Sequence, residues 1–598
     1  MGKTVTRQKI VLDIECYCNY FLIAVKNMAN GNTATYELSD WSNFDHEKLK
    51  AVLSNYTIIT FNGNRYDMLL LKYSLTGANN VQLKALSDAI IEGQAKPWDL
   101  ERKHNLPECK YIDHIDLIEV APGKCSLKTY GGRLHSERMQ DLPIRPEQRI
   151  TVEDRELLTL YCINDLDTTI DLYRQLEKQI DLRENMSIEF KSDLRSKSDA
   201  QIAEVVIRKQ VEKLKNEKIQ RPNLPIGYAF KYKAPAYIVY KTQNLKSVLN
   251  TFESANFTLN EKGDVAEPVE IGKLKVTLGT TVYQFGIGGI HSCEKKQATL
   301  ADESHRVFDR DVTSYYPNII LNQKLSPDHL GNDFLKVYKS IVDRRIRAKR
   351  SKDSVVDAAL KITINGSFGK LGSKWSVLYA PNLMAQVTIT GQLALMMLVE
   401  RLEGAGISVM SANTDGIVIR CHTSNQAAYL QIVASWETDT GFATEETEYL
   451  ALYSRDINNY IAIKPNGSYK VKGTYADASL SKTPTGQICS RALIDFLQLD
   501  IPMETTINSC SDIKQFVHVR NVTGGAVKGN DYLGRAVRWY YAIGESGTIN
   551  YAKNGNKVPR TDGAKPLMIL PKNMPKDLDR SWYIAETKNM LKELYISS

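Results

Sequence analysis

Residues 411–420, SANTDGIVIR, place the polar tetrapeptide Asn413-Thr414-Asp415-Gly416 between two apolar runs. β-Branched runs on either side of an Asn/Asp/Gly cluster are typical of a hairpin, and Asp415-Gly416 alone is a good turn signal. The stretch therefore predicts two antiparallel strands joined by a tight turn. An aspartate in such a turn can also bind a metal ion, so the rest of the chain must decide whether this is only a turn.

The composition indicates a multidomain globular protein. The 598 residues are 43% hydrophobic, which is enough for about four domains of ordinary size. No apolar run approaches the roughly 18 residues that span a bilayer, and the first ten residues lack the hydrophobic stretch of a signal peptide. We therefore expect a cytosolic protein. The nine cysteines form no metal-binding spacing.

The charge permits a polyanionic partner without requiring one, because the formal net charge is +8. Six cations and one acid lie within residues 343–352, DRRIRAKRSK. Such a run forms either a solvated helix face or a phosphate-binding face. Taken alone, the run favours the solvated face.

A first pair of acids lies near the start of the chain. Residues 9–17, KIVLDIECY, read as a buried strand. Asp13 and Glu15 are two residues apart, so both side chains leave the same face. Two acids on a core strand are costly unless a cation pairs with them. A strand end with solvated acids is the alternative.

Two further segments carry acids on predicted elements. Residues 57–73, TIITFNGNRYDMLLLKY, run from an apolar strand through a polar turn into a helix, and α/β folds keep their sites at such junctions. Residues 151–173 have helical apolar spacing after a start that resembles a capping box, with an ordinary amphipathic helix as the alternative. These segments offer Asn62, Tyr66, Asp67, Tyr161 and Asp165.

In this order, the three segments resemble the proofreading 3′–5′ exonuclease of the DEDDy class. The resemblance implies that Tyr161 orients the attacking water. Residues 126–132, SLKTYGG, also resemble the segment with which family B proofreading domains hold a single-stranded primer end, with a plain turn as the competing interpretation. The implied ligands of two divalent ions are Asp13, Glu15, Asp67 and Asp165, and the implied contacts of the primer end are Asn62, Tyr66, Ser126 and Leu127.

Residues 308–321, FDRDVTSYYPNIIL, closely resemble motif A of family B DNA polymerases, with Tyr315 in place of a leucine. The resemblance implies that Asp311 binds both catalytic metal ions. It also implies that the ring of Tyr316 excludes a ribose 2′-hydroxyl. We expect Pro317 to interrupt any early helix.

Two predicted helices follow, over residues 334–350 and, after a cap at Asp353 or Ser354, over residues 355–372. They resemble the fingers helices of the same family, whose motif B reads K-x-x-x-N-S-x-Y-G. Gly366 stands where the motif has Ser. The basic run then binds the triphosphate through charge-assisted bonds. The dNTP-binding residues that the resemblance implies are Tyr316, Arg345, Lys349, Lys361, Asn365 and Phe368, the last in place of Tyr.

The opening stretch lies where the family carries D-T-D-S in a hairpin. Asn413 takes the place of the first aspartate and Gly416 that of the serine. The second aspartate, which the family uses as a metal ligand together with that of motif A, is present as Asp415. The resemblance therefore implies a metal-binding pair of Asp311 and Asp415.

Two further stretches resemble DNA-contacting elements of the family. Residues 453–475 read as a hairpin that turns at Asn466-Gly467, with Ile457 and Asn458 where lysines are usual. Residues 285–292, FGIGGIHS, lie where protein-primed relatives have a glycine-rich loop, and their glycines either let the backbone approach DNA or simply make a turn. The implied DNA contacts are Gly288, Gly289, Tyr460, Lys472 and Gly473.

The predicted fold is mixed α/β and α+β and multidomain, with an RNase H-like exonuclease domain followed by a right-hand polymerase. The aromatic and basic residues 535–542, RAVRWYYA, either pack against duplex DNA or form a buried strand. The predicted domains are an exonuclease at 1–180, a first palm part at 181–333, fingers at 334–372, a second palm part at 373–475 and a thumb at 476–598, the last assigned mostly by position.

The implied function is a template-directed DNA polymerase that adds dNTPs to a primer 3′-hydroxyl by a two-metal mechanism and proofreads with its exonuclease. The expected cofactor is Mg²⁺, two ions per active site, with Mn²⁺ able to substitute. We expect primer–template DNA, dNTPs and replisome proteins as partners, no membrane, a monomer, and a cytoplasmic location, in the host cytoplasm if the protein is viral.

Spacing favours one kind of enzyme. Only 49 residues lie between Asp311 and Lys361, which leaves little room for the insertion that protein-primed relatives carry. We therefore expect a compact, phage-type replicative polymerase that extends nucleic-acid primers. The alternatives are an exonuclease whose polymerase half has decayed into a DNA-binding module, and a non-enzymatic single-strand-binding or scaffold protein.

Overall fold

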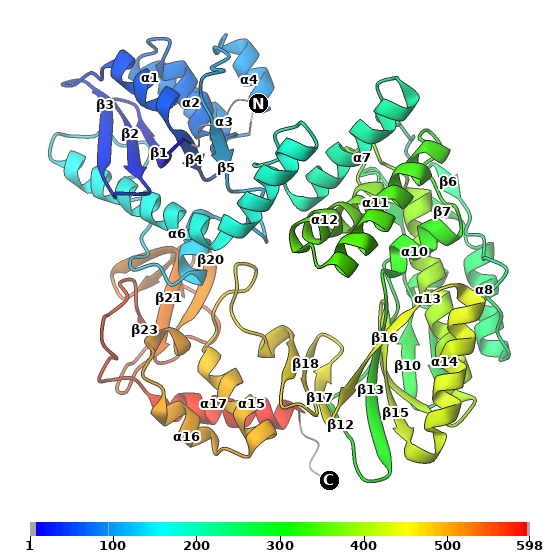
Figure 1. Ribbon diagram of the computed structural model, residues 1–598. Coiled ribbons are helices and arrows are strands. Elements are labelled where there is room, and N and C mark those ends of the chain that lie inside the picture. Colours follow the sequence, from blue (N-terminus) through cyan, green and yellow to red (C-terminus); the bar gives the residue numbers. More distant parts are fainter. Residues whose placement is uncertain (1–6, 94, 595–598) are drawn as a thin grey trace. The chain divides into compact units, whose positions relative to one another are not determined.

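The computed structural model describes residues 7–93 and 95–594 (Figure 1). It confirms a mixed α/β chain, which divides into two compact units. Unit 1 comprises residues 1–198, 477–489 and 505–584, and unit 2 comprises residues 199–476, 490–504 and 585–598. Three of the boundaries between them fall inside the helices α15 (Gln487–Leu499), α16 (Met503–Ser509) and α17 (Arg580–Leu594).

The N-terminal part of unit 1 is a five-stranded sheet flanked by helices. Its order is β3-β2-β1-β4-β5, in which β1, β2 and β3 pair antiparallel and β4 and β5 continue parallel to β1. The strands are β1 (Lys9–Tyr17), β2 (Tyr20–Asn27), β3 (Thr33–Ser39), β4 (Thr57–Thr60) and β5 (His114–Asp116), and the helices are α1 (His46–Asn55), α2 (Asp67–Ser74), α3 (Asn80–Ile91), α4 (Pro97–Lys103), α5 (Leu127–Arg133) and α6 (Asp154–Glu189).

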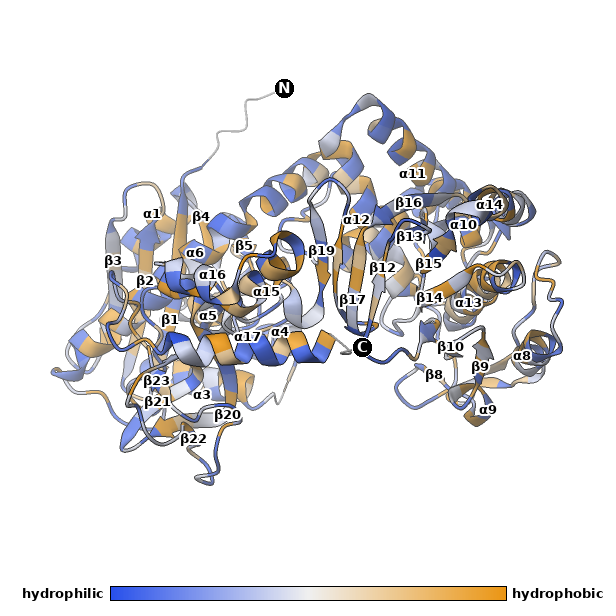
Figure 2. Cartoon of the chain, turned by 90° about the horizontal axis from the view of Figure 1, so that it is seen from below, coloured by the Kyte–Doolittle hydropathy of each residue, from blue (hydrophilic) through white to orange (hydrophobic). Residues whose placement is uncertain are grey.

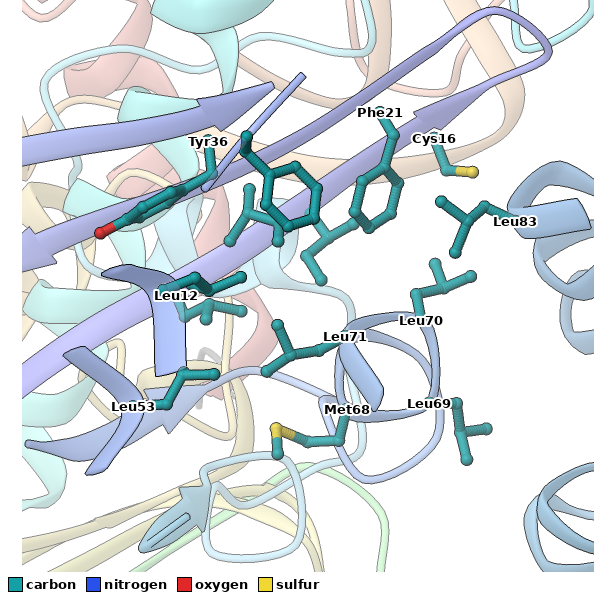
Figure 3. Close-up of a cluster of buried hydrophobic side chains, with 14 of the residues drawn as sticks. Leu12, Cys16, Phe21, Tyr36, Leu53, Met68, Leu69, Leu70, Leu71 and Leu83 are labelled. Atoms are coloured by element: carbon teal, nitrogen blue, oxygen red, sulfur yellow. The ribbon is translucent and has the colours of Figure 1, made fainter. Parts of the chain in front are cut away.

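Alternation along β1 gives this sheet two apolar faces. Leu12 lies in one core, which α1, α2 and α3 cover with leucines (Figure 3). Val11 lies in the other core, which α6 covers. Asp13 and Glu15 share the face of Val11, so the two acids of β1 point toward α6.

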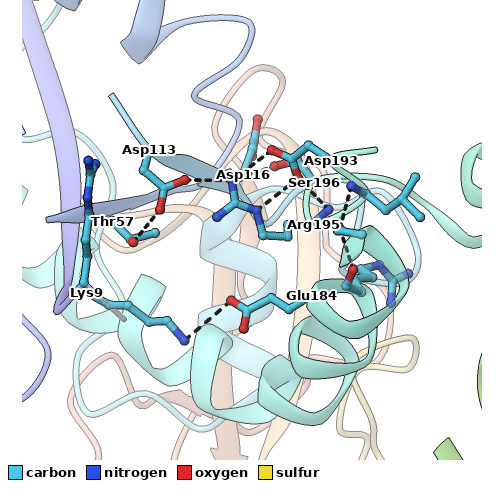
Figure 4. A network of polar contacts seen from close by, with 12 residues as sticks. Lys9, Thr57, Asp113, Asp116, Glu184, Asp193, Arg195 and Ser196 are labelled. Carbon is cyan, nitrogen blue, oxygen red and sulfur yellow. Dashed lines mark hydrogen bonds and ion pairs between the residues drawn. The ribbon is translucent and has the colours of Figure 1, made fainter. Parts of the chain in front are cut away.

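A polar network holds the edge strand β5 in place (Figure 4). The carboxylate of Asp113 accepts bonds from Arg195 Nη2 at 2.7 Å and from Thr57 Oγ1 at 2.6 Å. Ser196 Oγ accepts the backbone N–H of Asp116 at 2.9 Å. The segment after α6 therefore fixes the end of β5.

The C-terminal part of unit 1 is a second sheet, of order β22-β20-β21-β23. Residues 535–541 belong to a strand in it and are buried from Ala536 onward. The Arg538 guanidinium is fully buried among backbone carbonyls that include those of Leu567 and Ser136. The thumb assigned to 476–598 stays a prediction, although 505–584 belong to unit 1. The strands are β20 (His518–Lys528), β21 (Asp531–Tyr541), β22 (Asn550–Tyr551) and β23 (Ala564–Pro566).

Unit 2 is built on a seven-stranded antiparallel sheet of order β16-β13-β15-β14-β11-β10-β9. The hairpin predicted from SANTDGIVIR is confirmed, because β14 and β15 pair with only Thr414 and Asp415 between them. The strands are β9 (Lys275–Leu278), β10 (Thr281–Gln284), β11 (His291–Ser292), β13 (His305–Val312), β14 (Ser408–Asn413), β15 (Gly416–His422) and β16 (Thr444–Tyr449).

Two smaller sheets complete unit 2. The hairpin predicted within residues 453–475 is confirmed in the sheet of order β12-β17-β18-β19, where β18 and β19 pair around a turn at Asn466-Gly467. The strands are β12 (Gln297–Leu300), β17 (Ala451–Asp456), β18 (Asn459–Ile463), β19 (Tyr469–Lys472), and in the third sheet β6 (Ala229–Phe230), β7 (Phe257–Leu259) and β8 (Val265–Ala266).

The helices of unit 2 confirm the pair predicted after motif A, as α11 and α12, with Asp353 capping α12. Pro317 does not interrupt an early helix as expected but lies in the first turn of α10, where backbone N–H groups have no helical partner. The helices are α7 (Asp199–Lys215), α8 (Gln243–Ser254), α9 (Val269–Gly272), α10 (Tyr315–Asn322), α11 (Asn332–Ser351), α12 (Ser354–Leu371), α13 (Pro381–Glu403) and α14 (Gln426–Thr440).

Helix α13 is long and apolar enough to cross a membrane by length and composition, and Figure 2 colours the chain by hydropathy. However, 83% of the most apolar stretch of α13 is buried inside the protein. Its leucines and methionines, from Leu393 to Leu398, are fully or almost fully buried. This helix is therefore the core helix of unit 2.

Candidate active sites

The first site lies in unit 1, between β1 and α6. Asp13 and Glu15 leave β1 on the face that α6 covers, and Cys162 on α6 donates its thiol to Asp13 Oδ2 at 3.4 Å. The ligand atoms of these three residues lie within 4.8 Å of one another. Asp165 follows on α6, three residues further along, and is almost fully buried.

Asp67, the first residue of α2, adds a fourth carboxylate and is buried. Its Oδ1 is buried without a hydrogen-bond partner among the residues that the structure describes. The preceding turn contains Asn62 in the left-handed region, with φ +68°. Asp116 on β5 holds this turn by accepting the backbone N–H groups of Asn62 and Asn64 at 2.8 and 2.9 Å. Sequence reasoning missed Asp116, which lies some 50 residues away.

Burial and mutual repulsion dominate the electrostatics of this site. Burial, followed by the charge of Asp165, raises the pKa of Asp13 to about 7. Burial and the charge of Asp13 also raise the pKa of Glu15 and that of Asp67 well above their usual values. Four acids that are buried or partly buried and that repel one another form a site that attracts cations.

A lysine that sequence reasoning missed, Lys128, contacts this group of acids. Its Nζ contacts both carboxylate oxygens of Asp165 and lies 4.3 Å from the ring centroid of Tyr161. Ser126 caps the short helix α5 and Leu127 begins it, so SLKTYGG is a helix start rather than a plain turn. Lys128 could have been found from the sequence by its position directly after Ser126 and Leu127, which were predicted.

The other predicted residues of this site differ in their surroundings. Tyr161 is buried on the same face of α6 as Asp165. The Tyr66 hydroxyl bonds to Ser87 Oγ at 2.9 Å. The structure therefore brings Tyr161 to the acids, and engages the hydroxyl of Tyr66 with α3.

The second site lies in unit 2, where β13 ends. Asp311 pairs with Gly416 on β15 and with Glu445 on β16. The backbone N–H of Val312 donates to the carbonyl of Asp415 at 2.8 Å. Strand pairing thus sets the hairpin turn, and with it Asp415, beside Asp311. Burial and then the charge of Asp309 raise the pKa of Asp311 to about 6, and burial also raises the pKa of Asp415.

A cavity of about 620 Å³, the α11–α12 cleft, opens at this pair. Arg345 Nε is held by Asp357 Oδ1 at 3.1 Å, and Lys349 Nζ lies 3.6 Å from Glu445 Oε1. Its lining includes Asp311, Tyr316, Arg345, Lys349, Lys361, Asn365 and Asp415. Five predicted residues of the nucleotide site and the metal pair therefore line one space.

Phe368 joins this group through Tyr316, because their ring centroids lie 4.5 Å apart. The Tyr316 hydroxyl donates to the carbonyl of Gly288 at 3.4 Å. In the same loop, the carbonyl of Ile290 accepts the N–H of Thr414 at 2.9 Å. A Cβ on Gly289 would lie 3.2 Å from Thr414 Oγ1. The loop at 287–290 thus braces the turn that carries Asp415.

The structure gives local reasons for three departures from the family pattern. A Cβ on Gly416 would lie 2.1 Å from Asp311 Oδ1, so a side chain there would displace that carboxylate. A Cβ on Gly366 would lie 2.6 Å from the carbonyl oxygen of Asp199, because α7 packs closely on α12. Tyr315 is buried, and its hydroxyl donates to the carbonyl of Gly391 at 2.6 Å.

A second cavity, of about 370 Å³, shares Asp311 and Asp415 with the first, and we call it the β18–β19 cleft. Gly473 comes directly after Lys472, which lines this cleft, and has φ +65°. A Cβ on Gly473 would lie 2.2 Å from the carbonyl oxygen of Asn458. Sequence reasoning missed Asp309 and Lys470. The cleft is lined by residues that include Asp309, Asp311, Asn413, Asp415, Tyr449, Ile457, Tyr460, Lys470 and Lys472.

Comparison with known proteins relates part of the chain to DNA polymerases. No protein-family model matches it. The chain is 24% identical over 192 residues to DNA polymerase 1 of Saccharolobus solfataricus, which is 31% of this chain and 20% of that protein. It is 26% identical over 187 residues to DNA polymerase 1 of Sulfurisphaera ohwakuensis, with the same two shares. The chain thus matches about a fifth of the length of these curated relatives.

Among solved structures, the chain is similar to the family B DNA polymerase from the hyperthermophilic archaeon Pyrobaculum calidifontis. The TM-score is 0.41 at 14% sequence identity, and the match covers 100% of this chain and 80% of that one.

Proposed function

We propose that this protein is a family B DNA polymerase that extends a primer 3′-hydroxyl on a template and proofreads with a DEDDy-type 3′–5′ exonuclease. The observation that carries the proposal is the pairing of Asp311 with the Asp415 turn at a cleft that Arg345, Lys349 and Lys361 also line. Two acids beside several cations fit a reaction between metal ions and a polyphosphate. The similarity of part of the chain to curated DNA polymerases supports the same class.

Divalent ions fit both sets of carboxylates. In unit 1, the unpartnered Asp67 Oδ1 and the raised pKa of Asp13 both favour a bound cation. Carboxylate oxygens are the ligands that Mg²⁺ and Mn²⁺ prefer. When bound, such ions activate a hydroxyl or a water and neutralise phosphate charge. The residues that would hold them are Asp311 and Asp415 in unit 2 and Asp13, Glu15, Asp67 and Asp165 in unit 1.

In the α11–α12 cleft, the protein's own residues bind and select the nucleotide. The cations of α11 and α12 bind the triphosphate through charge-assisted bonds. The ring of Tyr316, which packs on Phe368, lies against the sugar and excludes a 2′-hydroxyl. Asn365 also contacts the nucleotide, and the ring of Phe368 packs against the nascent base pair.

At the exonuclease site, the chain orients the scissile end of a single strand. Tyr161 positions the attacking water, and Ser126, Leu127 and Asn62 hold the terminal nucleotides. Lys128 lowers the repulsion among the acids by its contact with Asp165. Gly288, Gly289, Tyr460, Lys472 and Gly473 contact the DNA being extended.

The finer identity rests on spacing. The 49 residues between Asp311 and Lys361 favour nucleic-acid primers over a protein primer, and a compact phage replicative enzyme. We propose that it works as a monomer in the cytoplasm, that of the host if it is viral, together with replisome proteins.

The test is extension of a duplex with a recessed 3′ end by the purified protein with dNTPs and Mg²⁺. The proposal predicts full-length product. Degradation without any extension would instead support the alternative, an exonuclease with a DNA-binding polymerase half. Neither activity would support a scaffold protein. Initiation on a serine or tyrosine of a partner protein would contradict the choice of primer.

A further inference from the structure

Cys162 is a buried thiol inside the acidic group of unit 1, and the proposed exonuclease gives it no role. The Y-x3-D pattern on α6 specifies Tyr161 and Asp165 and leaves the residues between them unspecified. Cys162 lies three residues before Asp165, so the two side chains share one face of the helix. Both side chains therefore face β1, and that of Cys162 is fully buried there.

The thiol lies at the distance that a shared metal ion requires. Its Sγ is 3.4 Å from Asp13 Oδ2, and the ligand atoms of Asp13, Glu15 and Cys162 lie within 4.8 Å of one another. With bonds of about 2.3 Å to sulfur and about 2.0–2.2 Å to oxygen, two ligand atoms of one tetrahedral zinc ion are about 3.5 Å apart. Small movements of these side chains therefore bring all three to one ion.

Asp67 indicates independently that an ion belongs in this group. The residue is 3% exposed, and its Oδ1 has no hydrogen-bond partner in the part of the chain that the structure describes. After burial, the charge of Asp13 does most to raise the pKa of Asp67, so this carboxylate faces the same acids. A buried carboxylate oxygen without a partner is costly unless a cation reaches it.

The neighbouring lysine does not pair with the acids beside the thiol. Lys128 pairs with Asp165, whereas Asp13 and Glu15 have no salt bridge to any residue that the structure describes. A cation at Asp13, Glu15 and Cys162 must therefore come from solution. The thiol decides which ion binds best there, because sulfur ligands favour Zn²⁺ whereas Mg²⁺ prefers oxygen.

We infer that Cys162, together with Asp13 and Glu15, forms a binding site for a thiophilic divalent ion such as Zn²⁺, which binds there in preference to Mg²⁺. In the metal-free protein the thiol donates its proton to Asp13, and binding of the ion releases that proton to solvent. The described residues that line the two clefts of unit 2 include no cysteine. The preference for Zn²⁺ therefore belongs to the site in unit 1.

The consequence for activity rests on the proposed exonuclease. Zn²⁺ bound in this way takes two of the four carboxylates that a pair of Mg²⁺ ions needs. Degradation of a single strand should therefore slow at zinc concentrations that leave primer extension unchanged.

The first test detects the bond between sulfur and metal in the full-length protein without DNA. Co²⁺ substitutes for Zn²⁺ and gives a charge-transfer absorption band in the near ultraviolet only when a thiolate binds it. We expect this band in the wild type, and a Mg²⁺ excess of about 100-fold should leave it in place. Cys162→Ser keeps a hydrogen-bond donor to Asp13 but offers no sulfur, so it should lack the band.

Two further variants locate the bond. Cys421→Ser removes another buried thiol, which donates to the carbonyl of His422 in β15 at 3.3 Å, and it should keep the band. Asp13→Asn retains Cys162 and removes a ligand of the same ion, so the band should need at least about 10-fold more Co²⁺. This variant tests the site even if Cys162→Ser fails to fold.

The second test follows both activities in Mg²⁺ while Zn²⁺ is added, with each protein compared with its own rate before the addition. The zinc concentration that halves single-strand degradation should be at least about 10-fold lower for the wild type than for Cys162→Ser. Extension of a paired primer by the wild type should change by less than about 2-fold over the same range.

Absence of the band in the wild type would overturn the inference, and so would an equal band in Cys162→Ser or an unchanged cobalt requirement in Asp13→Asn. Loss of the band in Cys421→Ser would place the bond at another thiol and would also overturn it, as would equal zinc sensitivity of degradation in the wild type and Cys162→Ser. A wild type that degrades no single strand in Mg²⁺ would instead contradict the proposed exonuclease, and the cobalt band would still report the metal site. The two failures are therefore distinguishable.

Discussion

The two carboxylate sites differ in burial and in the charges around them. The site between β1 and α6 has four acids, buried or partly buried, and one lysine, Lys128, in contact with them. The site at the end of β13 has Asp311 and Asp415 at the junction of two clefts that several cations line. The pKa of Asp13 rises to about 7, whereas that of Asp311 rises to about 6. Burial thus prepares the first site for cations alone, and exposure with surrounding cations prepares the second for cations together with phosphates.

The largest expected effect comes from Asp415→Asn, which replaces one carboxylate oxygen by an amide nitrogen at the β13 site and leaves the other site unchanged. Asp415→Asn removes a metal-binding charge and keeps the turn, so primer extension should fall by about 10³-fold or more. Degradation of a single strand should stay within about 2-fold of the wild type. The matched control is Asn413→Asp, two residues earlier in the hairpin, which should leave extension within a few-fold. Intact synthesis in Asp415→Asn would mean that the metal site is assigned to the wrong residue.

The cation of the buried site should matter next. Lys128→Met removes the charge that contacts Asp165 and the ring of Tyr161, so repulsion among the acids rises. Single-strand degradation should fall by about 10²-fold, and extension of a paired primer should not change. Lys124→Met, an exposed lysine four residues earlier, is the control. Equal rates of degradation by Lys128→Met and Lys124→Met would show that Lys128 does not contribute to this site.

The sequence predicted the parts of these sites that local patterns determine. The β14–β15 hairpin and the helices α11 and α12 follow from turn chemistry, capping and apolar spacing, all of which act within about 20 residues. The resemblance to known motifs then supplied the acids. Lys128 and Lys470 could not be found in this way, because they meet Asp165 and Asp309 across 37 and 161 residues of chain. Their contacts depend on strand register and helix packing, which a single sequence does not contain.

Packing around the open site gives a third prediction, on stability. Helix α12, which carries Lys361, lies against α7 at Gly366, where a Cβ would meet the Asp199 carbonyl oxygen at 2.6 Å. Gly366→Ala should therefore destabilise unit 2 by about 1–3 kcal/mol. Gly369→Ala is the control on the same helix, since a Cβ there meets nothing within 4 Å. It should be neutral or stabilising by about 0.5–1 kcal/mol, and chemical denaturation measures both.

The smallest effect concerns pH and the buried site. Because the pKa of Asp13 is raised to about 7 in the folded protein, the native state binds more protons than the unfolded chain between about pH 4 and pH 7. Stability without divalent ions should therefore fall as pH rises through this window. Asp13→Asn should remove part of that loss, roughly 1–3 kcal/mol at pH 8, and little at pH 4.

Thermal unfolding in EDTA measures this difference. Asp181→Asn, at an exposed position of the same helix α6 that carries Asp165, is the control and should follow the wild type. Mg²⁺ should raise the melting temperature of the wild type more than that of Asp13→Asn. The same pH dependence in both proteins would show that Asp13 is not held as an uncompensated buried acid.

The central claim is that the chain has two independent carboxylate sites with two activities. The most direct measurement of it uses a primer with a mismatched 3′ end. Asp13→Ala should neither remove the mismatch nor extend it efficiently, and Asp415→Asn should shorten the primer without extending it. An equimolar mixture of the two variants should yield full-length product, because one removes the mismatch and the other then synthesises. Extension by Asp415→Asn alone, degradation by Asp13→Ala alone, or no product from the mixture would contradict the account.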